Sequence, residues 1–231
     1  MKKNNKGFTL VELLVAIGIG ATVSAAIASL LVISLRMYNN ESVNAGLQYD
    51  LQTSLNQVMD SSMASSGLVL KQKSDGTGTE YAILGHFGRT KISGGTYQYD
   101  FYGEIFYADS AAPGGDGTFT IYMNRIPESA KLTGLASPDA MAASQVAVIT
   151  ANPKQYVLSK NVTNFKLECK SGVLDTVAHK FTNPVTLNVN LDFKQQGTGK
   201  EVNKRVEDQA VMRNRVKVPI VVDGVTYAMK E

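Results

Sequence analysis

A long uninterrupted run of apolar residues comes near the start of the chain, after a short basic segment. Residues 8–35 contain a single charged side chain, Glu12. A helix over these 28 residues is about 42 Å long at 1.5 Å per residue, and the hydrocarbon core of a bilayer is about 30 Å thick. The run therefore predicts a helix that can cross a membrane, with Arg36 at its far end.

The apolar positions that follow recur in steps of about four residues. They form the stripe Val43, Leu47, Leu51, Leu55, Val58 or Met59, and Met63, with polar residues on the other sides. This spacing is typical of a helix that buries one face. No proline interrupts residues 8–66, so we expect one continuous helix with an amphipathic half over residues 36–66, ending near Gly67.

Beyond Gly67 the hydrophobic pattern changes to a period of two, which is typical of strands. Glycine-rich turns separate the alternating segments. The fold class expected is α+β: a long N-terminal α-helix, hydrophobic and then amphipathic, packed on an antiparallel β-sheet head domain over residues 67–231. The predicted strands cover residues 80–87, 97–107, 118–123, 146–150, 185–194 and 207–212, and residues 128–144 are left unassigned.

Charge is distributed unevenly between the first residues and the rest of the chain. There are 23 Lys and Arg residues against 20 Asp and Glu, but Lys2, Lys3 and Lys6 precede Gly7. Without these three lysines the remaining 20 cationic side chains balance the 20 carboxylates. The basic pI therefore gives no support to nucleic-acid binding. The length beyond the helix suits one globular domain.

The position of Gly7 distinguishes the start of the chain from an ordinary secretory signal. In such a signal the small residues follow the apolar core, whereas Gly7 precedes it. Cleavage after Gly7 would remove the leader of residues 1–7, with its lysines, and keep the hydrophobic helix. The positive-inside rule places the leader in the cytoplasm and the head outside.

The run from Gly7 and Phe8 through Glu12 into the apolar helix resembles the class III signal of type IV prepilins and pseudopilins. The resemblance implies a pilin fold, cleavage between Gly7 and Phe8 by prepilin peptidase, and N-methylation of Phe8. It also implies assembly with other pilins or pseudopilins through the N-terminal helix, with Glu12 in subunit docking. The protein would be a single-pass protein of the cytoplasmic membrane before it enters a surface pilus.

Two interpretations of Glu12 stay open from the residues alone. Thr9 and Glu12 have the spacing of a capping box, so the carboxylate can close the first helical turn. Alternatively, it accepts the α-amino group of Phe8 from its own or a neighbouring subunit. A carboxylate costs about 2.5–3.5 kcal/mol in mid-bilayer, so such pairing would favour lateral assembly.

Later segments resemble, more loosely, the larger minor subunits of the J or W kind. Residues 8–35 lack the proline that kinks the helix of the abundant shaft pilins, and the single Cys169 cannot form their disulfide loop. We therefore expect a minor pilin that primes or caps a type IV pilus. The alternatives are a J-like minor pseudopilin of a type II secretion system, or a competence or adhesion pilin that binds DNA or a surface. The segments concerned are residues 51–59, 158–167 and 211–214.

No catalytic motif accompanies these features. His-Glu-x-x-His, Gly-x-Ser-x-Gly and Cys-x-x-Cys are all absent, so we expect no enzyme activity, cofactor or metal site. Calcium held by Asp75, Asp109 and Asp116 is a weaker alternative, because Asp-Gly is common in turns. Cys169 alternates with Phe165 and Leu167, and the pattern predicts a buried thiol.

Two further groups of residues suggest ligands of the head. A basic group near the C-terminus, including Lys204 and Arg205, is interleaved with Glu207 and Asp208, which favours a solvated face over a DNA site. An aromatic cluster is better explained by core and sheet packing than by an adhesive patch. Its members are Tyr97, Tyr99, Phe101, Tyr102, Phe106 and Tyr107.

Overall fold

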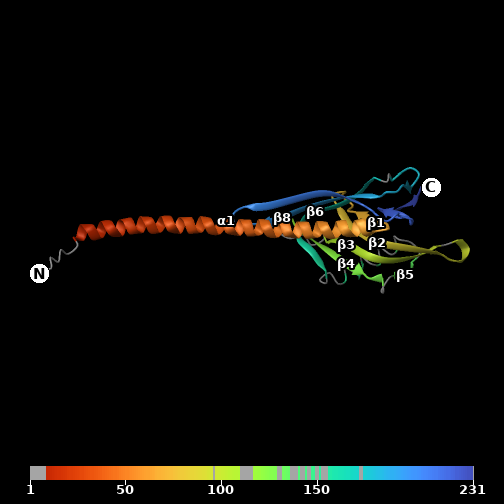
Figure 1. Ribbon diagram of the computed structural model, residues 1–231, viewed down its shortest axis with the longest axis horizontal. Coiled ribbons are helices and arrows are strands. Elements are labelled where there is room, and N and C mark those ends of the chain that lie inside the picture. Colours follow the sequence, from red (N-terminus) through yellow and green to blue (C-terminus); the bar gives the residue numbers. More distant parts are fainter. Residues whose placement is uncertain are drawn as a thin grey trace.

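A single long helix runs from one end of the molecule into the sheet at the other end (Figure 1). Helix α1 spans Leu10–Ala64, 55 residues without a break, or about 82 Å at 1.5 Å per residue. The C-terminal strands lie at the end remote from the start of α1. The computed structural model describes residues 9–95, 97–109, 117–128, 132–135, 140, 144, 147–148, 151, 156–171 and 174–230.

The strands form one sheet with the order β7-β11-β10-β1-β2-β3-β4-β6-β8-β9, and β5 pairs with β3 outside this path. Neighbours are antiparallel except for the parallel pairs β1–β10 and β11–β7. The strands are β1 Gly67–Gln72, β2 Thr79–Lys91, β3 Tyr97–Asp109, β4 Phe119–Ile126, β5 Leu132–Leu135, β6 Val157–Ser171, β7 Lys180–Phe181, β8 Thr186–Gln196, β9 Glu201–Val211, β10 Ile220–Val222 and β11 Val225–Met229.

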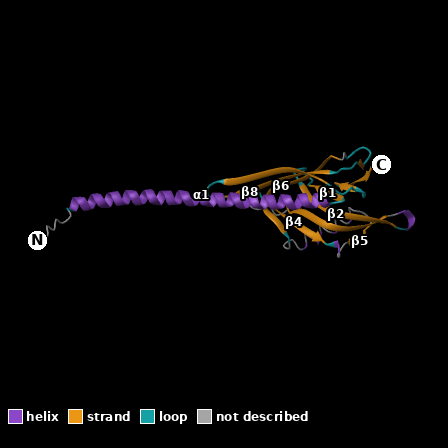
Figure 2. Ribbon diagram, in the orientation of Figure 1, coloured by secondary structure: helices purple, strands orange, loops and turns teal. Residues whose placement is uncertain are grey.

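The sheet curls around the second half of α1, so strands lie on both sides of the helix (Figure 2). The helix contacts β9, β8, β6 and β2. Leu47, Leu51 and Val58 are buried in this contact, as the apolar stripe predicted. The facing positions of β8 are Leu187, Val189, Leu191 and Phe193, all at most 1% exposed. The α+β fold class is confirmed.

The β8–β9 hairpin reaches down the helix and marks where packing begins. The backbone N–H of Thr198 in its turn donates to Oδ1 of Asn40 over 2.9 Å. A Cβ at Gly197 would lie 2.6 Å from the same oxygen, so glycine allows this contact without displacing the Asn40 side chain. Residues 10–39 of α1 are all exposed, and Asn40 is the first that is partly covered.

The other end of α1 is closed by the segment after β9. The N–H of Arg213 donates to the carbonyl of Met63 over 3.0 Å, and the side-chain amide of Asn214 donates to the carbonyl of Ala64 over 2.5 Å. These bonds satisfy carbonyls that a helix end leaves without an intrahelical partner. Helix α1 ends at Ala64, two residues before the end predicted from the sequence.

Most predicted strands are present with wider bounds, and one is wrong where it is described. Residues 80–87 and 97–107 fall in β2 and β3, residues 118–123 and 185–194 each start one residue before β4 and β8, and the last predicted strand covers only the end of β9. In the segment 146–150, Ala147 and Val148 are helical and exposed, so their strand-like pattern has no buried sheet face to fit, and the other three residues lie outside the described chain.

Candidate functional site

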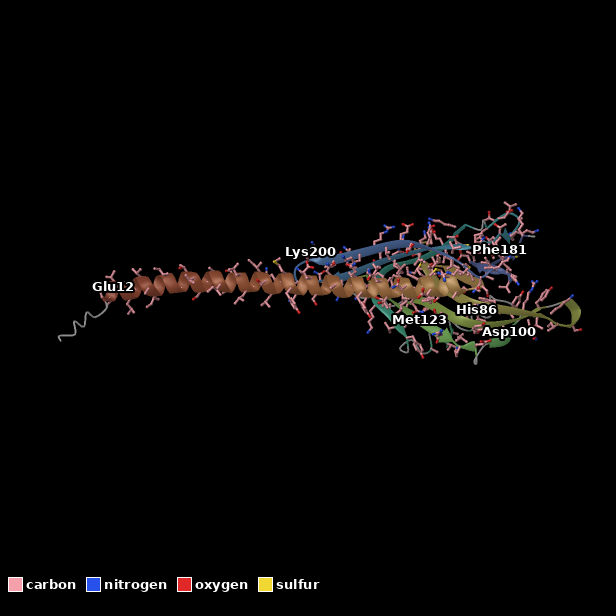
Figure 3. The ribbon with its side chains drawn as sticks, in the orientation of Figure 1. Glu12, His86, Asp100, Met123, Phe181 and Lys200 are labelled. Atoms are coloured by element: carbon pink, nitrogen blue, oxygen red, sulfur yellow. The ribbon has the colours of Figure 1, made fainter. Side chains whose placement is uncertain are left out.

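The first turn of α1 is closed by a capping box. Thr9 has extended backbone angles, and its hydroxyl oxygen accepts from the N–H of Glu12 over 3.3 Å. In return, Oε2 of Glu12 accepts from the N–H and from the hydroxyl of Thr9, each over 2.9 Å. Figure 3 shows Glu12 at the tip of the rod, far from the sheet.

This local arrangement uses only one oxygen of the carboxylate. Both bonds from Thr9 end on Oε2, and within the described part of the chain Oε1 accepts no hydrogen bond. Because an ionised carboxylate can accept at both oxygens, the capping box leaves room for a further donor. Gly7, Phe8 and the leader lysines lie outside the described residues, directly before the extended Thr9.

The first half of α1 presents an apolar surface that the rest of the described chain does not cover. Among the described residues, helix α1 is long and apolar enough to cross a membrane, and its most hydrophobic stretch, near the N-terminus, is wholly exposed. Two hydroxyl groups on it are satisfied within the helix: Thr22 donates to the carbonyl of Ile19 and Ser29 to that of Ala25, each over 2.8 Å. A surface of this kind needs lipid or another apolar surface as its partner.

Small residues occur along the same exposed half. Ala16 and Gly20 are four residues apart. A second row, Ala21, Ala25 and Ser29, has the same spacing of four residues. A Cβ added at Gly18 or Gly20 would meet no atom within 4 Å. Such spacing lets the backbones of neighbouring helices approach closely in an apolar environment.

A second polar feature joins the far end of α1 to the sheet. Glu104 of β3 is 9% exposed, and the side-chain amide of Gln57 donates to both of its carboxylate oxygens over 3.0 Å. The hydroxyl of Ser61 also donates to Oε2. Sequence reasoning missed this cluster because its members are more than 40 positions apart, and the only signal was an acidic residue inside an apolar strand.

The acidic residues considered for calcium do not gather into one site. Oδ1 of Asp75 accepts from the N–H and hydroxyl of Thr77 over 2.9 and 2.7 Å, which is a turn contact. Asp109 is at the end of β3, and Asp116 lies outside the described residues. In the described ranges no three His, Cys, Asp or Glu side chains are grouped as metal ligands.

The residues considered for DNA or a surface are also dispersed. In the register of β8 and β9, Lys204 lies opposite Phe193 and Arg205 lies opposite Asp192. As neighbours on one strand, the two cations point to opposite faces of the sheet. Nε of Arg205 is 3.5 Å from Oδ1 of Asp192. In the aromatic cluster, Tyr99, Phe101 and Phe106 are buried, which agrees with core packing.

One family model matches the chain, under the description prokaryotic N-terminal methylation motif, over residues 2–28. Comparisons with curated proteins and with solved structures gave no match. The motif, together with a long N-terminal helix packed on a curled, mainly antiparallel sheet, supports membership of the type IV pilin and pseudopilin superfamily. The motif points to a structural subunit that is processed by prepilin peptidase and assembles with other pilins. The J or W subtype stays a prediction.

Cys169 lies on the core side of β6, as its alternation with Phe165 and Leu167 predicts, but its residue is partly buried rather than fully buried. Burial raises the pKa of its thiol to about 11. Since only the thiolate is nucleophilic, about one molecule in 10,000 carries the reactive form at pH 7.

We therefore expect Cys169 to resist a maleimide reagent at pH 7 in the folded full-length chain and to react completely in guanidinium. The measurement is the mass increase of the intact protein over time. Thr53→Cys, on an exposed face of α1, is the matched control and should gain one label quickly. Labelling of Cys169 as fast as that of the control would contradict its burial.

Proposed function

We propose that this chain is a minor pilin of a type IV pilus, which primes or caps the filament from a membrane-anchored precursor. Prepilin peptidase cuts between Gly7 and Phe8 and N-methylates Phe8. The mature subunit then leaves the bilayer when its apolar half-helix packs among the helices of other pilins. The observation that carries this proposal is the wholly exposed apolar half of α1, which begins inside the methylation motif matched over residues 2–28.

The geometry at Glu12 supports a role in docking as well as in capping. Oε2 is held by Thr9, while Oε1 accepts no hydrogen bond from any residue that the structure describes. In the mature chain the new α-amino group of Phe8 lies at the end of each helix, and a neighbouring subunit can bring its own to this oxygen. In apolar surroundings an unpaired carboxylate is costly, so the pair would favour lateral association.

The absence of a proline from residues 8–35 supports a low-copy role. Residues 8–35 contain no proline, and α1 runs unbroken from Leu10 to Ala64. The abundant shaft pilins of the resembling family carry a kinking proline in this region. A subunit with a straight apolar helix suits a terminal position, where fewer neighbours constrain its path through the filament.

Gly7→Val should leave an uncut precursor, because a branched side chain replaces the small residue before the scissile bond. Gly18→Val, which adds the same side chain inside the apolar helix, should be cut normally. The intact mass of the protein from cells with and without prepilin peptidase measures both. Complete removal of residues 1–7 from Gly7→Val would contradict the assigned cleavage site.

Glu12→Gln should be cut normally yet enter filaments at least about tenfold less than the native chain, equivalent to a loss of about 1.4 kcal/mol. Glutamine keeps an oxygen for the N–H of Thr9 but loses the charge, so it separates capping from pairing. Thr9→Ala, which removes the cap and keeps the charge, is the control and should assemble nearly as well as native. The amount of subunit in sheared filaments is measured. If Glu12→Gln assembles like the native chain and Thr9→Ala does not assemble, then Glu12 acts only as a helix cap and the proposed pairing is contradicted.

A further inference from the structure

Strand β9 ends the sheet, and no described strand lies beside its outer edge. Both β8 and β9 belong to the continuously described residues 174–230. Figure 1 shows β9, in blue, extending along α1. The strand has 11 residues, which give about 36 Å of edge at 3.3 Å per residue. A strand edge of this length is a template for pairing with another chain unless the protein blunts or covers it.

The backbone groups of the odd-numbered residues of β9 face this outer edge. The N–H of Met212 donates to the carbonyl of Val185 over 2.9 Å, and the register of β8 and β9 continues unbroken from there. Because successive residues of a strand direct their backbone groups to opposite sides, even-numbered residues of β9 bond to β8 and odd-numbered ones point outward. The N–H of Gln209 accordingly donates to a side chain, Oδ1 of Asp208, over 2.7 Å.

The side chains of β9 carry a charge pattern that is complementary to its own reverse. Residues 203–209 read Asn-Lys-Arg-Val-Glu-Asp-Gln, with two cations before the central valine and two carboxylates after it. If two copies lie antiparallel with the valines opposite each other, Arg205 of each copy is opposite Glu207 of the other. In the same register Lys204 is opposite Asp208. All four charges of each copy therefore meet an opposite charge.

Backbone and side chains favour the same register. Since only odd-numbered residues point outward, the two-fold axis must pass through a residue and not between two residues. With the axis at Val206, all 11 residues of β9 have a partner, which is the longest overlap that the strand allows. Moving the axis by one residue places Arg205 opposite Arg205 or Glu207 opposite Glu207, and like charges directly opposite are destabilising.

The charges of this edge are accessible to a partner. No ion pair joins Lys204, Glu207 or Asp208 to another residue within the described ranges. Arg205 has its Nε 3.5 Å from Oδ1 of Asp192, but its side chain is 65% exposed. Charges on an edge strand deter pairing with arbitrary strands. In this order they admit a second copy of the same strand.

We propose that the edge of β9 is a homophilic interface, in which two copies of the chain pair as antiparallel strands about Val206. The contact is isologous, because the same edge of both copies takes part. Backbone hydrogen bonds supply the affinity, and the order of the charges selects the partner. The interface belongs to the head alone and goes beyond the proposed role of the N-terminal helix.

The direction of β9 decides where two copies can meet. The turn before β9 is bonded to Asn40, and Arg213, after β9, is bonded to Met63, so β9 runs in the same direction as α1. Figure 3 shows Lys200, directly before β9, at the end of the head nearest the apolar half of α1. Antiparallel pairing therefore points the two apolar half-helices in opposite directions. The two copies belong to separate assemblies, on two filaments or two cell surfaces.

The register is tested by disulfide formation in the full-length chain in nonionic detergent, with Cys169→Ala as the background. Val206→Cys should form a covalent dimer under mild oxidation, measured on a non-reducing gel. At the two-fold axis the two Cα atoms of this non-hydrogen-bonded pair are about 4.5 Å apart, within the range of a disulfide.

Val202→Cys is the matched control. It changes the same residue type on the same face of β9, and both valines are partly buried. In the proposed register, however, residue 202 lies about 27 Å from its copy, at 3.4 Å per residue, so this variant should stay monomeric.

An exchange of charges tests the selection of the partner. Lys204→Glu with Arg205→Glu gives an acidic variant, and Glu207→Lys with Asp208→Lys gives a basic variant. Each should self-associate at least about tenfold more weakly than the native chain in sedimentation equilibrium at low salt, because like charges then lie opposite. An equimolar mixture should associate like the native chain, since all four central pairs again join opposite charges. Misfolded variants would not recover in this way.

The proposal is contradicted if Val206→Cys stays monomeric. It is also contradicted if Val202→Cys forms the dimer equally fast, since that would indicate collision within detergent micelles. A mixture of the acidic and basic variants that associates no better than either variant alone would likewise overturn it. None of these results bears on cleavage after Gly7, so failure here is distinguishable from failure of the proposed function.

Discussion

The apolar surface of the first half of α1 is the constraint on which the rest of the molecule depends. Large side chains such as Leu10, Ile17 and Leu30 are more than 60% exposed, and each gains about 1.5–3 kcal/mol when it is buried. No described residue of the head covers them. This half of the helix is therefore stable inside a bilayer or packed among similar helices. When it moves from the bilayer into such an assembly, it exchanges one apolar environment for another.

The two halves of α1 differ in what completes their burial. From Asn40 onward the sheet supplies the partner, and the β8–β9 hairpin fixes where that packing starts. Before Asn40 no described residue of the head supplies a partner. One continuous helix thus joins a half that the sheet buries to a half that the described chain leaves exposed, so the exposed half can change its surroundings without disturbing the packing of the other.

The sequence was sufficient for the features that depend on local pattern. The length of α1, its buried stripe and the core side of Cys169 followed from periodicity, and the N-terminal motif followed from the order of Gly7, Phe8 and Glu12. Features set by distant contacts were not predictable. The parallel pairing of β1 with β10 and the bonds from Gln57 and Ser61 to Glu104 join segments without any spacing signal, and at the exposed, helical Ala147 and Val148 the strand-like pattern was misleading.

In the proposed function, the apolar half of α1 survives maturation and enters a filament. Mass spectrometry of the polypeptide in filaments sheared from the native cell surface gives the clearest test. We expect a chain that begins at methylated Phe8 and retains the whole of α1. A chain that begins at Met1, or one that begins after residue 35, would contradict it.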